Sequence, residues 1–133
     1  LVMHWKYTSK PDLTQFGFVY CITNDETGKA YIGCKQYFNY KKGKKKSESN
    51  WQTYMGSSKH LLEDIKKIGK EKFKFKILAE FKNKRSLRYY ECYYQMKYNV
   101  LTSTLEGTEE PAYYNNYVGG KFYRPVQLYI DFS

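Results

Sequence analysis

Glu91 is the residue whose surroundings most clearly indicate chemistry. Apolar residues around it recur at helical spacing and predict a helix from about Ser86 to Tyr98. One stripe of this helix would be apolar and consist of Leu87, Tyr90, Tyr94 and Tyr98, with Glu91 in its middle. Because an unpaired buried carboxylate is costly, Glu91 should be bound to a cation, protonated, or ion-paired with a Lys or Arg of a neighbouring sheet. Helix geometry alone leaves these alternatives open.

Two strands precede that helix and carry two tyrosines at matching positions. Residues 16–23 and 30–36 are rich in β-branched and aromatic side chains, and the turn-forming residues 24–28 separate them. This pattern predicts an antiparallel hairpin with Tyr20 on its first strand and Tyr31 on its second.

The remaining elements complete a small α+β fold. A helix should begin near Ser57 or Ser58, either of which can cap it, and end at Gly69. Residues 73–77 alternate between apolar and polar and predict a third strand. The order β-β-α-β-α predicts a small central antiparallel three-stranded sheet flanked by helices.

The hairpin resembles the two-part signature of the GIY-YIG nuclease family. Gly17-Phe-Val-Tyr20 and Tyr31-Ile-Gly33 match its two halves, in the variant with one extra residue after the first glycine. Further matches follow in the family's order, at Gly56-Ser-Ser-Lys-His-Leu61, Asp64-Ile-Lys-Lys-Ile-Gly69, Phe73, Glu91 and Tyr114-Asn115. The resemblance covers about residues 16–120, which is most of the chain.

The resemblance implies a site for metal-dependent cleavage of double-stranded DNA. Glu91 would hold one Mg²⁺ (or Mn²⁺), Tyr20 or Tyr31 would activate or orient the attacking water, and Asn115 would support the site. A tyrosine acts as a base only if positive charge lowers its pKa of about 10 towards neutrality. Lys35, on the same strand face as Tyr31, could supply that charge. No small-molecule cofactor is implied.

Two positions depart from the family pattern. The family's usual arginine corresponds to Lys41, and Lys lacks the bidentate guanidinium fork, so Lys35, Lys42 or Arg88 are alternatives for its role. The family's histidine before the first helix is replaced by Met55-Gly56. Tyr54 is a candidate for that contact, whereas His60 is expected to face solvent.

Charge points to a polyanionic partner. The 133 residues carry a formal net charge of +10, and a domain that repels itself so strongly usually binds nucleic acid or an anionic surface. The tract Lys41–Lys46 predicts a mobile basic loop within residues 38–50 that contacts phosphates without reading sequence. The candidate DNA-binding residues are Lys41, Lys42, Lys44, Lys45, Lys46, Ser57, Ser58 and Lys59. Tyr89 and Tyr93 lie off the predicted apolar stripe, so they either stack on bases or are ordinary, partly buried tyrosines.

Other classes of protein fit less well. The chain has no apolar run of membrane-spanning length and no signal-peptide pattern. The three cysteines, Cys21, Cys34 and Cys92, include no Cys-x-x-Cys pair, which indicates reduced thiols rather than disulfides or zinc ligands. We therefore expect an intracellular protein, in the cytoplasm of a bacterial host if it is phage-encoded.

The sequence thus predicts a single nuclease domain over residues 1–133, with a polar, irregular lead-in at 1–15 and an irregular tail at 118–133. A lysine-rich insertion before Trp51 favours a freestanding phage homing-type enzyme over a restriction-type enzyme. A non-catalytic nucleic-acid-binding module is the alternative outside the nucleases, but it would not need Tyr20, Tyr31, Glu91 and Asn115 together. Since the core occupies most of the sequence, we expect only a modest sequence preference unless the protein dimerises or the sequence is part of a longer protein.

Overall fold

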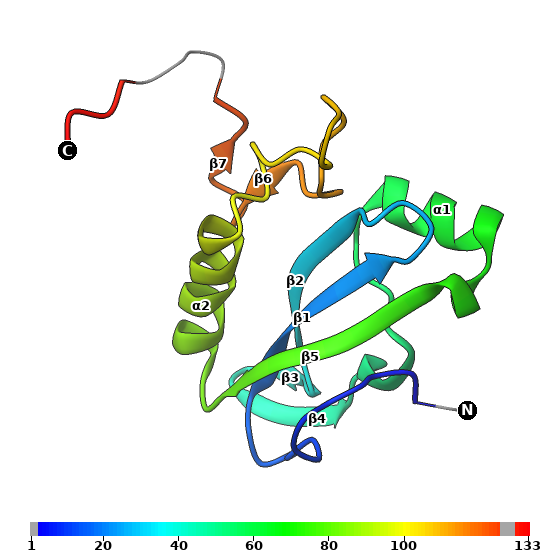
Figure 1. Cartoon of the computed structure of the whole chain (residues 1–133). Helices are drawn as coiled ribbons and strands as arrows, with labels where there is room; N and C mark the ends of the chain where they lie inside the picture. The colour runs from blue at the N-terminus through cyan, green and yellow to red at the C-terminus, as the bar shows by residue number, and fades with distance from the viewer. Residues whose placement is uncertain (1–2, 126–129) are drawn as a thin grey trace.

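A three-stranded antiparallel sheet organises the molecule (Figure 1). The computed structural model describes residues 3–125 and 130–133. The sheet has the order β2-β1-β5, and its strands are β1 (Gly17–Asn24), β2 (Ala30–Gln36) and β5 (Phe73–Phe81). Two α-helices flank it, α1 (Lys59–Ile68) and α2 (Lys84–Lys97). The predicted α+β class and central sheet are therefore confirmed.

Shorter elements connect and extend this framework. These are the strands β3 (Phe38–Lys41), β4 (Lys44–Glu48), β6 (Tyr117–Val118) and β7 (Phe122–Tyr123), and the 3₁₀ turns η1 (Trp51–Thr53) and η2 (Lys70–Lys72). None of the described helices is long and apolar enough to cross a bilayer.

The two faces of the sheet carry separate cores. Alternate residues of a strand point to opposite faces, so Phe18, Tyr20 and Ile22 of β1 pack with Leu61 and Ile65 of α1. On the other face, Val19 of β1 and Ile32 of β2 pack with Leu87 of α2. The helices thus cover opposite faces, and the edge of β2 lies between them (Figure 1).

Both helices begin at side-chain caps. Ser58 Oγ accepts a hydrogen bond from the backbone N–H of Leu61 (3.2 Å), as predicted for the first helix. The second helix begins two residues earlier than predicted, because Asn83 caps it by accepting from the backbone N–H of Ser86 (2.9 Å).

The apolar stripe predicted for the second helix is confirmed at Leu87 and agrees with the structure at Tyr94, which packs against the core, but it is wrong at Tyr90 and Tyr98. Tyr90 and Tyr98 are 40% and 41% exposed, whereas Leu87 and Gln95 are the buried residues of α2. The face towards the sheet therefore follows Leu87, Glu91 and Gln95, at i, i+4 and i+8. A tyrosine can keep its hydroxyl end in water, so aromatic type was a poor guide to burial here.

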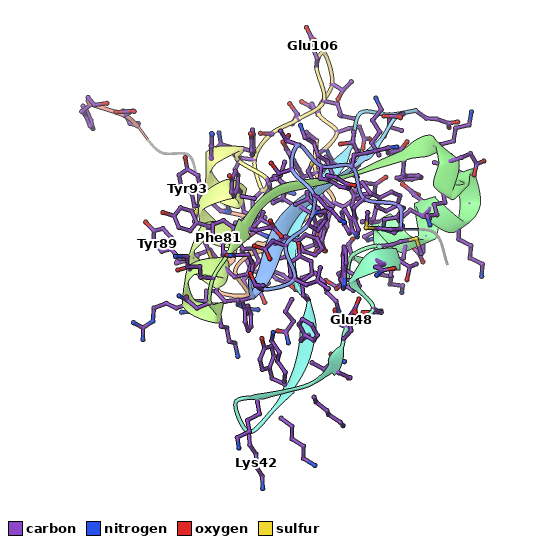
Figure 2. The ribbon with its side chains drawn as sticks, turned by 90° about the horizontal axis from the view of Figure 1, so that it is seen from below. Lys42, Glu48, Phe81, Tyr89, Tyr93 and Glu106 are labelled. Atoms are coloured by element: carbon purple, nitrogen blue, oxygen red, sulfur yellow. The ribbon has the colours of Figure 1, made fainter. Side chains whose placement is uncertain are left out.

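The predicted mobile basic loop is instead a β-hairpin. β3 and β4 pair antiparallel from Phe38↔Glu48 to Lys41↔Lys44. Lys42 and Gly43 form the turn with positive φ angles of 51° and 79°, which is the backbone shape of a tight two-residue hairpin turn. Lys42 lies at the far end of this hairpin, away from the rest of the molecule (Figure 2).

The ends of the chain are also more ordered than predicted. Within the expected lead-in, Trp5 is 3% exposed and belongs to the core. Lys6 pairs with β5 by donating to the Phe75 carbonyl (2.7 Å) and accepting from the Ile77 N–H (2.9 Å). In the expected irregular tail, β6 and β7 form a short antiparallel pair; residues 126–129 lie outside the described part.

Candidate active site

A polar cavity of about 360 Å³ lies along the free edge of β2. Tyr31, Tyr54 and the start of α1 line it from one face of the sheet, and Arg88, Glu91 and Gln95 of α2 line it from the other. Residues 114–117, 119 and 120 complete the wall. The antiparallel sheet thus brings together segments that are far apart in the sequence.

Glu91 of α2 lies at this edge, where it lines the cavity together with Cys34 of β2. Burial raises the pKa of Glu91 above its ordinary value, and the positive charge of Arg88 offsets only part of that effect. Within residues 3–125 and 130–133, no cationic group lies within ion-pair distance of Glu91. The sequence analysis allowed an ion pair between Glu91 and a Lys or Arg of the sheet. Among the described residues, this ion pair is not formed.

The two tyrosines of the hairpin occupy different environments. The Tyr31 side chain lines the cavity, and its hydroxyl forms a hydrogen bond with Ser57 Oγ (3.1 Å). Burial raises its pKa to about 12. Tyr20 is 1% exposed and lies behind Tyr31 in the core, where burial raises its pKa well above the ordinary value. Of these two tyrosines, Tyr31 is therefore the one that can contact a ligand in this cavity directly.

Gly33 lies where these tyrosines need space. A Cβ atom at this position would lie 2.6 Å from the Tyr20 hydroxyl oxygen and 3.0 Å from the Tyr31 ring. These distances are shorter than van der Waals contact, so any larger residue would displace one of the rings. This accounts physically for glycine at the end of the second half of the motif.

Asn115 binds the edge of β2 as a neighbouring strand would. Its amide Nδ2 donates to the Ile32 carbonyl (2.8 Å), and its Oδ1 accepts from the Ile32 N–H (3.1 Å). Gln95 Nε2 donates to the same carbonyl (2.9 Å), while Gln95 Oε1 accepts from the Gly119 N–H (3.1 Å). Asn115 is 3% exposed. Its buried amide therefore helps to fix the position of β2 at the cavity.

A comparison with models of known protein families shows which family the chain belongs to. The family model described as "Putative endonuclease segE, GIY-YIG domain" matches residues 2–118. The chain belongs to the GIY-YIG nuclease family. No curated protein sequence and no solved structure matches the chain significantly.

None of the three lysines considered for the role of the GIY-YIG family's usual arginine, Lys35, Lys41 and Lys42, lines this cavity. Lys41 lies at the end of β3 and does not line the cavity, and neither does Lys42. Lys35 is also outside the lining; its ammonium lies over the Tyr54 ring, 4.2 Å from the centroid. Burial lowers the pKa of Lys35. Arg88 is the alternative that the fold brings into the cavity, one helical turn from Glu91.

The start of α1 supplies a second group of polar atoms to the same cavity. Ser57, Ser58 and Lys59 all line it. The first N–H groups of a helix have no partner within the helix and favour anions such as phosphate. Tyr54, proposed in place of the missing histidine, lies beside them. His60 is exposed, as predicted, and pairs with Glu63 (3.6 Å).

Several residues of the site were not expected. Gln95 and Cys34 were missed because neither type is distinctive in a helix or a strand, although Gln95 lies one turn beyond Glu91. Tyr89 and Tyr93, by contrast, lie on the outer surface of α2 and are 66% and 44% exposed (Figure 2). The interpretation of these two tyrosines as partly buried is therefore wrong.

A divalent cation fits the residues present at Glu91. Its carboxylate borders a polar cavity, and oxygen ligands are those that Mg²⁺ and Mn²⁺ prefer. The described residues contain no group of three or more His, Cys, Asp or Glu side chains that could hold a metal by themselves. Mg²⁺ suits such a site, because it keeps several waters and is commonly bound by one or two carboxylates together with substrate phosphate.

Proposed function

We propose that this protein is a divalent-metal-dependent DNA endonuclease that hydrolyses phosphodiester bonds in the cavity beside β2. The observation that carries the proposal is the meeting of Glu91 and Tyr31 at one polar cavity, from opposite faces of the sheet. Membership of the GIY-YIG family supports nuclease chemistry. The net charge of +10 supports a nucleic-acid substrate.

Glu91 holds the metal ion in this proposal, with Mg²⁺ or Mn²⁺ as the expected ion. The ion would supply Lewis-acid polarisation of the scissile phosphate and neutralise charge on the leaving oxygen. Cys34 of β2, which lines the same cavity, orients the carboxylate in this proposal. The raised pKa of Glu91 means that acidification removes the anionic ligand at a higher pH than for an exposed glutamate.

Tyr31 contacts the attacking water and accepts or orients its proton. A phenol with a pKa of about 12 is almost entirely protonated at neutral pH, so it works as a base only where positive charge stabilises the phenolate. Arg88 and Lys59 line the same cavity and bring such charge. Tyr20 acts on Tyr31 by packing behind it and is a positioning residue.

The start of α1 binds the substrate backbone. Ser57, Ser58, Lys59 and the free N–H groups of the helix receive a phosphate, while Arg88 takes the place of the family's arginine. Asn115 and Gln95 keep the edge of β2 at a fixed distance from α2.

A phage homing-type enzyme is the class that we favour, acting in the cytoplasm of a bacterial host. The description of the matching family, a putative segE endonuclease with a GIY-YIG domain, supports the broader class of endonuclease. The runner-up is a restriction-type enzyme. A non-catalytic binding module is disfavoured, because binding alone gives no reason to bury a carboxylate beside a phenol at an open cavity.

Cleavage of supercoiled plasmid DNA tests the proposal. We expect conversion to nicked or linear DNA with Mg²⁺ or Mn²⁺, and no conversion with EDTA. Binding to the same plasmid is measured in EDTA by gel shift. Binding without cleavage under any divalent cation would support the non-catalytic module instead.

A further inference from the structure

The β3–β4 hairpin is fixed to the body at its base. The Ser49 N–H donates to the Tyr37 carbonyl (2.8 Å), and Ser49 Oγ donates to the Gln36 carbonyl (2.7 Å). Glu48 accepts a hydrogen bond from the indole N–H of Trp51 (2.9 Å), which is 3% exposed. Since β2 leads directly into β3, the hairpin has a defined orientation relative to the cavity.

The two faces of the hairpin differ in chemistry. One face carries Phe38, Tyr40 and Lys45: the Tyr40 ring stacks on Phe16, with centroids 5.3 Å apart, and the Lys45 ammonium lies over the Phe38 ring (4.4 Å). Phe38 and Tyr40 on this face are partly buried by contacts within the protein, whereas Lys45 is exposed.

The opposite face is polar and open. It carries Asn39 opposite Ser47 and Lys41 opposite Lys44. Asn39 Nδ2 donates to Ser47 Oγ (3.1 Å), and both residues are exposed. Within residues 3–125 and 130–133, the Asn39 oxygen, its second N–H and the Ser47 hydroxyl hydrogen have no other partner and are available to a ligand.

Positive charge surrounds this open pair. Five lysines lie between positions 41 and 46, and no acidic residue occurs between Phe38 and Ser47. Lys41 and Lys44 are direct cross-strand partners, an arrangement of like charges that weakens a hairpin. A bound polyanion relieves this repulsion.

We propose that the β3–β4 hairpin enters the major groove of duplex DNA and that Asn39 and Ser47 contact base edges there. Two paired strands about 5 Å apart fit a groove about 12 Å wide. The lysines at the tip and sides meet phosphates, whereas an asparagine amide matches the adenine edge and a serine hydroxyl bonds to several bases. The hairpin then supplies sequence preference within the nuclease fold. This inference rests on the proposed function only in taking duplex DNA as the substrate.

Selection of bound DNA tests the proposal without requiring cleavage. The wild-type protein is mixed with a library of random-sequence duplexes in EDTA, and the bound fraction is sequenced. We expect at least one adenine-containing position to be enriched, by roughly tenfold or more over the other bases. The double variant Asn39→Thr, Ser47→Ala keeps strand propensity at position 39 and should lose that enrichment, with affinity for the unselected library nearly unchanged.

Lys45→Gln is the matched control, because Lys45 belongs to the same hairpin but lies on the face opposite Asn39 and Ser47. It should lower affinity for all duplexes and leave the enriched base unchanged. Backbone amide spectra of each variant establish that the hairpin is still formed. Replacing purines of the selected duplex by 7-deaza analogues, which lack the N7 acceptor of the major groove, should abolish the preference.

This assignment would be overturned if the double variant selected the same base with unchanged enrichment. It would also be overturned if the protein still preferred the selected duplex after its purines were replaced by 7-deaza analogues. A wild-type protein that binds all duplexes equally would overturn it too. A protein that shows the preference yet cuts no DNA would refute the proposed nuclease function and leave the role of the hairpin standing.

Discussion

At the scale of single residues, the two tyrosines of the motif differ in what they can reach. Tyr31 meets the cavity and Ser57, whereas Tyr20 is enclosed among aromatic side chains. The same residue type in matching sequence positions therefore has two roles. Register explains this: Ile22, not Tyr20, is the β1 partner of Tyr31, so the rings are offset along the strands.

Tyr31→Phe should lower the single-turnover cleavage rate by about 10²- to 10⁴-fold, the usual range for general acid–base help. A phenol with a pKa of about 12 gains phenolate tenfold for each pH unit across neutrality, so the wild-type rate should rise with pH and that of the variant should be flatter. Rates measured across neutral and mildly alkaline pH at saturating DNA check this. Equal pH slopes in both proteins would exclude Tyr31 as the base.

Tyr20→Phe provides the comparison at the same scale. It removes a hydroxyl that does not line the cavity, so it should reduce the rate less than Tyr31→Phe and leave the pH slope unchanged. A larger effect from Tyr20 than from Tyr31 would reverse the two roles.

Glu91→Gln should stabilise the metal-free protein. Burial raises the pKa of Glu91, so at neutral pH the folded state holds a carboxylate that would be better solvated in the unfolded chain. Removing that charge should raise the free energy of unfolding by about 1 kcal/mol. The advantage should shrink as the pH falls through the raised pKa, because the wild-type carboxyl then becomes neutral. Thermal unfolding in EDTA at several pH values measures it, and a less stable variant at neutral pH would contradict this account.

At the scale of elements, the edge of β2 is the part that matters most. An uncovered edge strand exposes N–H and C=O groups that invite aggregation. Here Asn115 and Gln95 cover the backbone groups of Ile32. The groups that close the sheet are thus neighbours of the groups that would bind metal and substrate.

Asn115→Ala should open that edge. The Ile32 N–H loses its acceptor, and its amide hydrogen should exchange with solvent faster than in the wild type. Stability should fall by about 1–3 kcal/mol, the usual cost of leaving buried polar groups unsatisfied. Hydrogen exchange followed by NMR measures the first effect and thermal unfolding the second. Wild-type protection at Ile32 would show that Asn115 does not hold the edge.

The elements also show what could be predicted from the sequence. The caps and periodicity of α1, the β-branched and aromatic content of β1 and the alternation in β5 are local signals, and the structure agrees with them. The prediction that Tyr90 and Tyr98 are buried was wrong, because their burial depends on which face of α2 packs against the sheet. The hairpin at 38–48 was missed because its lysines suggested disorder, although Lys42-Gly43 is a turn pair. The position of Arg88 beside Glu91 follows from helix geometry once Glu91 is placed, but its entry into the cavity depends on tertiary packing.

At the scale of the whole molecule, two groups of basic residues lie where the proposal places DNA. The hairpin tip carries five of the lysines, and it projects away from the body (Figure 2). The cavity adds Lys59 and Arg88. We therefore expect the hairpin to supply most of the salt-dependent affinity and the cavity to supply the chemistry.

Replacing Lys41, Lys42, Lys44, Lys45 and Lys46 by Gln should weaken binding to every duplex. The slope of log affinity against log salt should become shallower by about 0.9 for each phosphate that the variant no longer neutralises. The cleavage rate at saturating DNA should change little, because these lysines do not line the cavity. Titrations at several salt concentrations measure the slope, and an unchanged slope would mean that the hairpin does not bind phosphates.

The central claim is that the cavity beside β2 is a metal-dependent catalytic centre built on Glu91. The most direct test compares wild type and Glu91→Gln on the same DNA, with binding measured in EDTA and single-turnover cleavage measured with Mg²⁺ and with Mn²⁺. We predict equal binding within a few-fold and loss of cleavage in the variant under both metals. Cleavage at the wild-type rate by Glu91→Gln would contradict the claim and place the catalytic centre elsewhere.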